Sequence, residues 1–191
     1  PEARMPRWWF DGDAGGGWLG ASGSHVIDQV RAWLGDFASV SAALPTVADR
    51  KNAAEDSFLI RYTLANGCEG VSQQTGGAWG PNAAMTRISG TRGTLWVENG
   101  AVWLADRDGA VELPIPRELQ LPPAPEFDHP LYQFLKLELP PAQRLCERWR
   151  AAIETGALDP ALATFADGAA CMKVIDAVRA SAAGGGALAA V

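Results

Sequence analysis

A histidine on the polar side of an amphipathic helix is the residue of this chain best suited to acid–base chemistry. The chain has two histidines, and His25 lies in the segment 15–28, GGGWLGASGSHVID. Asp28 follows three residues later, and residues three apart on a helix are neighbours. Its carboxylate can accept a hydrogen bond from one imidazole nitrogen and leave the other free for proton transfer. His25 and Asp28 are therefore candidate catalytic residues, and a solvated or capping histidine is the alternative that fits the same spacing.

The helix that carries His25 is predicted over residues 17–34 from its apolar periodicity. At about 100° per residue, one arc of roughly 120° collects the apolar residues of this segment. The members of this arc are Leu19, Val26, Ile27, Val30, Trp33 and Leu34. We expect this stripe to be buried. His25 projects from the opposite side, with Ala21 one turn before it.

The glycines at the start of this helix match a nucleotide-binding pattern. Gly15, Gly17 and Gly20 satisfy G-x-G-x-x-G, the fingerprint of dinucleotide-binding loops. That fingerprint requires a buried strand before it and an acidic residue after the following strand. Here residues 8–10, WWF, and a turn precede the glycines, and Asp36 comes before the next predicted strand. We therefore reject the nucleotide interpretation and expect close backbone approach or an unhindered helix start.

Composition excludes several classes of function. The 191 residues are 48% hydrophobic and 20% charged, which is enough for one ordinary globular core. The net charge of −6 and the lack of a basic cluster argue against a nucleic-acid partner. No apolar run reaches the ~20 residues that span a bilayer, so no membrane partner is expected. Cys68, Cys146 and Cys171 are odd in number and far apart, which indicates a reducing, cytoplasmic compartment, and no metal site is expected.

The order of the predicted elements indicates an α+β fold. After the first helix, strands are predicted at residues 39–44, 57–64, 69–75, 85–89, 94–98, 101–105 and 111–113. The turns between them, such as Asn66-Gly67, are tight and predict an antiparallel meander. Helices are predicted at residues 131–137, 142–155 and 165–182. This order predicts a mostly antiparallel, open-faced sheet with helices on one face.

The face of the sheet that the helices leave open must meet solvent or a partner. In the strand 57–64, Phe58, Ile60 and Tyr62 are expected on the covered face. Leu59 and Leu64 are expected on the open face, with Arg61 and Thr63. A second apolar component there favours a homodimer or higher homo-oligomer formed through the open sheet face.

Four motifs, in this order and spacing, resemble the C-terminal domain of the glucose–fructose oxidoreductase / inositol dehydrogenase / MocA (Gfo/Idh/MocA) family. Residues 15–28 are similar to the family's G-G-G-x-L-x-D-x-G-S-H-x-x-D. Asn66-Gly67 occupies the central hairpin, and residues 88–95, ISGTRGTL, are similar to I-x-G-T-x-G-x-L. Residues 165–181 are similar to the closing F-x-D-G…V-L-D-A-I-x-x-S helix.

The resemblance covers nearly the whole chain and implies its organisation. It implies one substrate-binding and oligomerisation domain over residues 1–191, with the fold of the C-terminal domain of glyceraldehyde-3-phosphate dehydrogenase. Family members carry an N-terminal Rossmann domain that binds NAD or NADP and supplies a catalytic lysine, and this domain is absent from the chain. Since residues 1–7 resemble the interior of a longer protein, we expect a fragment that binds no cofactor and is inactive alone.

The resemblance also implies a reaction. The family transfers a hydride between a secondary alcohol, usually on a sugar or polyol, and C4 of the nicotinamide. His25 maps to the histidine that takes or gives the hydroxyl proton, and Asp28 would orient it. Many members carry an aspartate four residues before the histidine, where this chain has Ala21. A changed reaction therefore stays open, as does a non-catalytic ligand-binding or dimerisation module.

The expected partner is a small-molecule substrate, and the residues expected to line its cleft surround the glycines and the helix. They are Trp8, Trp9, Gly16, Gly17, Trp18 and Gln29. Aromatic faces stack on sugar rings, and core packing around the helix start is the alternative for the three tryptophans. His129, in a loop of sequence Asp-His-Pro, is expected to have no function.

Overall fold

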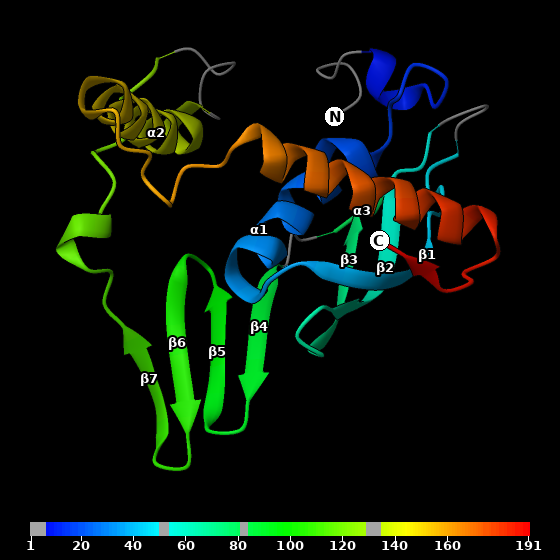
Figure 1. Ribbon diagram of the computed structural model, residues 1–191, viewed down its shortest axis with the longest axis horizontal. Coiled ribbons are helices and arrows are strands. Elements are labelled where there is room, and N and C mark those ends of the chain that lie inside the picture. The colour runs from blue at the N-terminus through cyan, green and yellow to red at the C-terminus, as the bar shows by residue number, and fades with distance from the viewer. Residues whose placement is uncertain (1–6, 50–53, 81–83, 129–134) are drawn as a thin grey trace. The chain divides into compact units, whose positions relative to one another are not determined.

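The computed structural model describes residues 7–49, 54–80, 84–128 and 135–191. The chain divides into two compact units, which we call the first unit (Pro1–Trp79 with Ala163–Val191) and the second unit (Gly80–Leu162) (Figure 1). The α+β class and the antiparallel pairing are confirmed. The strands form two four-stranded sheets, however, where the sequence predicted one. One domain over residues 1–191 stays a prediction.

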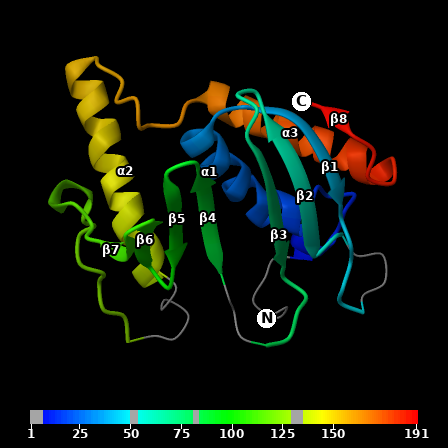
Figure 2. The same cartoon turned by 90° about the horizontal axis from the view of Figure 1, so that it is seen from below.

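The first unit places helices against one four-stranded antiparallel sheet. Its strands lie in the order β3-β2-β1-β8. Their bounds are β1 (Phe37–Ala43), β2 (Ser57–Leu64), β3 (Glu69–Thr75) and β8 (Ala189–Ala190). The helices are α1 (Ser24–Leu34) and α3 (Phe165–Ala183), and both views show α3 lying across the sheet (Figures 1 and 2).

The core of the first unit lies between this sheet and its helices. Alternate side chains of β2 point into it, as a strand's two-residue period requires. They are Phe58, Ile60, Tyr62 and Leu64, all under 9% exposed. The prediction that Leu64 lies on the open face was wrong, because Leu64 follows Tyr62 by two residues and shares its face. Leu59 lies on the other face and is 43% exposed.

The predicted helix over residues 17–34 consists of a π-helical turn (Leu19–Gly23) followed by α1. Its predicted stripe is mostly confirmed. Leu19 and Ile27 are buried, and Val26, Val30 and Leu34 pack against the core. Trp33 is an exception with 49% exposure. It lies at the edge of the arc in the last turn, where Leu34 contacts the core instead.

A capping box begins α3. The hydroxyl of Thr164 accepts from the backbone N–H of Asp167, and the Asp167 carboxylate accepts from the backbone N–H of Thr164. This satisfies two N–H groups that a helix start leaves without partners. Near the other end, Ser181 Oγ accepts from Ala42 N at 2.9 Å and donates to the Ala187 carbonyl at 2.6 Å. These bonds tie α3 to β1 and to the segment before β8.

The second unit contains a sheet of three successive hairpins and a helix. Its strands are β4 (Met85–Gly90), β5 (Gly93–Glu98), β6 (Ala101–Asp106) and β7 (Gly109–Leu113), in that order. The helix α2 (Leu135–Thr155) continues through Pro140 and Pro141, where the sequence predicted a break between two helices. Both prolines lie near its N-terminal end, so the missing N–H donors leave the longer C-terminal part intact.

None of the helices in the described ranges combines the length and the apolar character that crossing a bilayer requires.

Candidate functional site

Residues 15–17, which we call the glycine loop, fold tightly against the 3-10 helix Arg7–Phe10. Gly16 N donates to the Asp11 carbonyl at 2.8 Å, and Gly17 N donates to the Trp9 carbonyl at 2.9 Å. A Cβ on Gly16 would lie 2.1 Å from the Trp8 carbonyl oxygen. Any side chain at this position would therefore displace backbone, and close approach is the reason for this glycine.

Glu55 holds the other side of the glycine loop. Its carbonyl accepts from Trp18 N at 2.9 Å, and its carboxylate Oε1 accepts from Leu19 N at 3.3 Å. Gly17 has a φ of +117°, and a Cβ there would lie 2.1 Å from the same carboxylate oxygen. Glu55 was not predicted as a site residue, because it ends a long polar loop and belongs to no motif.

This geometry does not fit the pyrophosphate of a dinucleotide. The element before the glycines is a 3-10 helix, where the nucleotide-binding fold needs a buried strand. The Leu19 amide, which would face a phosphate, already donates to the Glu55 carboxylate. A second anion at the same place would be repelled by that carboxylate. The structure thus gives the physical reason for rejecting a nucleotide site at these glycines.

The π-helical turn connects the glycine loop to α1 and determines where His25 begins to project. Ser24 N donates to the Leu19 carbonyl, five residues earlier, which closes the wide turn. Gly23 is buried in this turn, where a Cβ would lie 2.9 Å from Leu19 Cδ1. His25 follows in the first turn of α1, with its side chain exposed. Short π-helical turns are frequent at functional sites, which agrees with a functional role for this segment.

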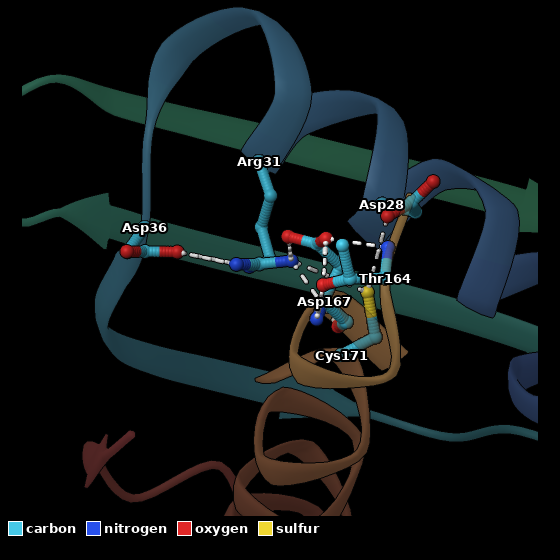
Figure 3. A network of polar contacts seen from close by, with 6 residues as sticks. All are labelled: Asp28, Arg31, Asp36, Thr164, Asp167 and Cys171. Carbon is cyan, nitrogen blue, oxygen red and sulfur yellow. Dashed lines mark hydrogen bonds and ion pairs between the residues drawn. The ribbon is translucent and has the colours of Figure 1, made fainter. Parts of the chain in front are cut away.

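Asp28 interacts with α3 instead of with His25. Its Oδ1 accepts a hydrogen bond from Cys171 Sγ at 3.5 Å (Figure 3). Within the described part of the chain, no hydrogen bond or ion pair joins His25 to Asp28. The predicted bond that would set the histidine tautomer is therefore not formed. The catalytic roles of His25 and Asp28 stay predictions.

Arg31 is the centre of the polar network between α1 and α3 (Figure 3). Its side chain is 12% exposed and lies 2.8 Å from Asp36 Oδ1. Nη1 donates to the Asp167 carbonyl at 3.2 Å and lies 3.9 Å from Cys171 Sγ. The network joins the helix that carries His25 to the last helix. No motif marked Arg31 in the sequence, because its partners lie up to 140 residues away.

Besides Arg31, whose pKa is raised, two groups of this network have shifted pKa values. Hydrogen bonds from the backbone and the hydroxyl of Thr164 lower the pKa of Asp167, and Arg31 lowers it further. Burial raises the pKa of the Cys171 thiol, and the hydrogen bond to Arg31 offsets this only in part. Near neutral pH, Asp167 is therefore ionised, and Cys171 is a neutral thiol that donates to Asp28. Asp167 therefore takes part in the cap at the start of α3 as an ionised carboxylate.

The three tryptophans differ in their surroundings. The rings of Trp8 and Trp9 meet edge to face with centroids 5.9 Å apart, and Trp8 is 51% exposed. The ring of Trp18 packs against the core and lies against Gly76, where a Cβ would approach within 3.1 Å. Its Nε1 is buried with no hydrogen-bond partner in the described ranges. Trp18 therefore packs against the core, which was the alternative to a sugar-stacking role, whereas part of the Trp8 ring is exposed to solvent.

The structure therefore brings together one part of the predicted site. Trp8, Trp9, Gly16 and Gly17 form the glycine loop and its 3-10 helix, and Trp18 follows directly. On α1, His25, Asp28 and Gln29 share no hydrogen bond with one another in the described residues. His129 and residues 131–134 lie outside the part of the chain that the structure describes.

Gln74 is a residue of this region that the sequence analysis missed. It lies on β3, and its Oε1 accepts a hydrogen bond from Ser22 Oγ of the π-helical turn at 2.6 Å. Both side chains are half-buried. The available signal was the run of Ser72 and Gln74 at alternate positions of a predicted strand, where apolar residues would be expected.

Comparison with known families finds one match. The model described as the GFO/IDH/MocA C-terminal domain matches residues 1–96. No curated protein matches the sequence.

Solved structures share the fold. Levoglucosan dehydrogenase in complex with NADH and levoglucosan has a TM-score of 0.74 and 25% identity, covering 97% of this chain and 53% of that chain. A putative oxidoreductase from Thermotoga maritima has a TM-score of 0.70 and 22% identity, with coverages of 98% and 51%. The WlbA dehydrogenase from Bordetella pertussis, in complex with NADH and UDP-GlcNAcA, has a TM-score of 0.67 and 19% identity, with coverages of 97% and 51%. The chain therefore spans about half the length of these solved chains.

Proposed function

Because the chain belongs to the GFO/IDH/MocA C-terminal domain family, we propose that it is the substrate-binding part of an NAD(P)-dependent oxidoreductase acting on a secondary alcohol of a sugar or polyol. The family match confirms the resemblance drawn from the motifs of the sequence. Levoglucosan dehydrogenase, the 25% identical relative, is solved with NADH and levoglucosan. That relative supports the class of cofactor and of substrate in this proposal.

The observation that carries the proposal is the placement of His25. Its side chain is exposed in the first turn of α1, directly after the π-helical turn and the tight glycine loop. All of these features lie within the residues that the family model matches. An imidazole can take a proton from a bound alcohol and return it. In the proposed reaction, His25 takes the hydroxyl proton on oxidation and returns it on reduction.

The cofactor in this proposal binds mainly outside the chain. The glycine loop does not fit a pyrophosphate, because the Leu19 amide that would face it already donates to the Glu55 carboxylate. NAD or NADP supplies the hydride acceptor when bound elsewhere in the protein. The roles assigned to this chain are binding the substrate and moving its hydroxyl proton. Cytoplasmic location is part of the proposal, supported by the three free cysteines.

The role of Asp28 is indirect in this proposal. Its bond to Cys171 ties α1 to α3, so Asp28 would hold the helix that presents His25. Ala21, which stands at the family's aspartate position, has no side chain that could orient the imidazole. We therefore propose Asp28 as a positioning residue for the helix. A ligand-binding module without redox activity is the competing function, which the lack of a carboxylate at residue 21 favours.

Turnover of the complete gene product that contains this chain decides between these functions. We expect His25→Ala to lower kcat for a sugar or polyol by about 10²–10⁴-fold, the range of a lost acid–base group. Lys173→Ala, an exposed change on α3, is the matched control and should leave kcat unchanged. Oxidation at the unsubstituted rate in His25→Ala would contradict the proposal. Binding of a polyol without any oxidation would favour the non-catalytic module.

Self-association is a second proposed function, supported by one face of the second sheet. The strand register places a series of apolar side chains on the same face. They are Ile88, Leu95, Val97, Val102, Leu104, Val111 and Leu113. Leu95 and Val111 are 41% and 57% exposed.

The other face of this sheet is more polar. It includes Arg87 and Glu112, which are in register with the stacked Trp96 and Trp103. We propose that the apolar face pairs with a second copy of the chain.

The outer face of β2, which the sequence favoured for dimerisation, is more polar. Leu59 is exposed there, but Arg61 pairs with Glu69 at 3.2 Å beside it. We expect Leu95→Lys to convert an oligomer to monomers, as measured by light scattering. Glu112→Lys, on the opposite face of the same sheet, is the control that should keep the oligomer. An unchanged mass in Leu95→Lys would contradict an interface through this sheet.

A further inference from the structure

Polar residues occupy core-facing positions of the edge strand β3. Ser72 pairs with Ile60, and Gln74 pairs with Phe58, and paired residues of antiparallel strands share a face. Phe58 and Ile60 are 0% and 3% exposed, whereas Ser72 and Gln74 are half-buried. A polar side chain placed toward a core costs free energy unless it gains hydrogen bonds. Packing alone therefore does not account for Gln74.

The hydrogen bonds of Gln74 leave its donors unused. Ser22 Oγ donates to the amide oxygen at 2.6 Å. Within the described ranges, this is the only side-chain hydrogen bond between residues 19–34 and a strand. The amide group also carries two N–H donors, and neither has a partner among the residues that the structure describes. The Ser22 bond thus fixes the amide while both donors stay available.

These donors lie beside the turn that presents His25. Ser22 comes three residues before His25, and residues at that spacing are neighbours on a helix. Two residues beyond Gln74, Gly76 lies against the ring of Trp18, where a Cβ would approach within 3.1 Å. Trp18 comes four residues before Ser22. β3 and the residue that follows it therefore meet the helical segment at two places, where Gln74 bonds Ser22 and Gly76 lies against Trp18. These contacts fix Gln74 against the segment that carries the histidine.

From this juxtaposition we infer that Gln74 is a specificity-determining residue. Its amide donates a hydrogen bond to the oxygen of a hydroxyl group adjacent to the one whose proton His25 exchanges. Ser22 is the positioning residue that holds the amide. The substrate class is therefore a vicinal diol within a sugar or polyol, in place of an isolated secondary alcohol. This inference rests on the proposed function.

The test compares substrates with and without a neighbouring hydroxyl group. The complete gene product would be assayed with NAD and NADP on levoglucosan, D-glucose, myo-inositol and 2-propanol. For the diol substrates, Gln74→Ala should raise KM about tenfold and change kcat less than twofold, as expected for one lost hydrogen bond. KM for 2-propanol should not change, because this alcohol has no second hydroxyl. Gln73→Ala, exposed on the opposite face of β3, is the matched control.

Two further variants separate recognition from structure. In Gln74→Glu, a carboxylate still accepts from Ser22 but has no N–H donors, so KM for diols should rise as in Gln74→Ala. Ser22→Ala leaves the amide unfixed and should raise KM about threefold. A purely structural role would lower the melting temperature and kcat for all four alcohols together. An unchanged KM for diols in Gln74→Glu, or an equal rise for 2-propanol, would overturn the inference.

Separate measurements of turnover and of ligand binding distinguish a failure of this inference from a failure of the proposed function. If His25→Ala abolishes turnover while Gln74→Ala leaves KM unchanged, the inference fails and the proposed function stands. If the unsubstituted protein oxidises none of the four alcohols, the proposed function fails. Saturation-transfer NMR with levoglucosan, D-glucose and myo-inositol then tests the inference. Signals that disappear in Gln74→Ala and persist in Gln73→Ala support it, and the absence of binding to the unsubstituted protein overturns it.

Discussion

Both sheets have strands with regularly alternating apolar residues, but the two sheets differ in the burial of those residues. In the first unit, Val40, Phe58 and Leu64 are at most 1% exposed. In the second unit, no residue of strands β4–β7 within the described ranges is buried, although Leu95, Val97 and Leu104 alternate as regularly. Alternation in a strand therefore specifies which residues share a face, and the neighbouring layer determines whether that face is buried.

This difference separates the proposed tasks of the two units. The first unit has a packed core that fixes the glycine loop, the π-helical turn and α1 in place. A site that positions a proton-transferring group needs such support. The second unit offers an apolar sheet face that other protein surface could cover. We therefore assign substrate binding to the first unit and self-association to the second.

The largest expected effect contrasts one side chain from each sheet. Phe58→Ala should lower the free energy of unfolding by about 3–5 kcal/mol, because Phe58 is fully buried and its loss leaves a cavity. Leu95→Ala, at a residue 41% exposed, should cost less than ~1 kcal/mol in the monomer. Urea unfolding of both variants, at a concentration where the chain is monomeric, measures the contrast. Equal losses would show that the second sheet is also a core.

An intermediate effect contrasts two glycines. Gly16→Ala places a Cβ 2.1 Å from a backbone oxygen, so the glycine loop must shift, and we expect stability to fall by more than ~1 kcal/mol. Gly100→Ala, in a hairpin of the second unit, meets nothing within 4 Å and should cost only the strain of its positive φ, about 1 kcal/mol. The same unfolding experiment compares them. If proton transfer depends on the loop, Gly16→Ala should also lower kcat in the complete gene product.

The smallest effect concerns the start of α3. Thr164→Ala removes the cap and should lower the free energy of unfolding by about 1 kcal/mol, while Thr164→Ser keeps the hydroxyl and should cost less.

The pKa of Asp167 is lower in the folded protein than in the unfolded chain, where it is about 3.9. Its contribution is therefore complete above that value and is lost as pH falls through the folded pKa. Asp167→Asn should remove this pH dependence from unfolding curves, and a dependence that persists would assign it to other carboxylates.

Much of the fold followed from local patterns. The strands β2 and β3 have the bounds that the sequence predicted, because alternating apolar residues and the Asn66-Gly67 turn define them. The start of α3 was predicted at residue 165, where the structure places it. The division into two sheets did not follow, since no local signal in residues 75–85 shows that pairing ends at β3. The continuous α2 was missed because two prolines usually end a helix.

The candidate site was predicted less completely than the fold. The motif around His25 and the expectation of close backbone approach at its glycines were visible in the sequence. The partners of these residues were not, because they come from distant segments. Glu55 and Gln74 reach the helical segment from a loop and an edge strand. Cys171 donates to the Asp28 carboxylate, which was expected to bond His25. Such pairings depend on the tertiary fold, which one-dimensional spacing does not encode.

Hydrogen exchange in the presence of a polyol tests the assignment of the site most directly. The complete gene product would be compared with and without saturating levoglucosan and NADH, using peptides from both units. The account predicts slower exchange in residues 15–29 and 69–76, and no change in residues 85–113 beyond that caused by NADH alone. Protection confined to residues 85–113, or none in residues 15–29, would contradict the placement of the substrate site in the first unit.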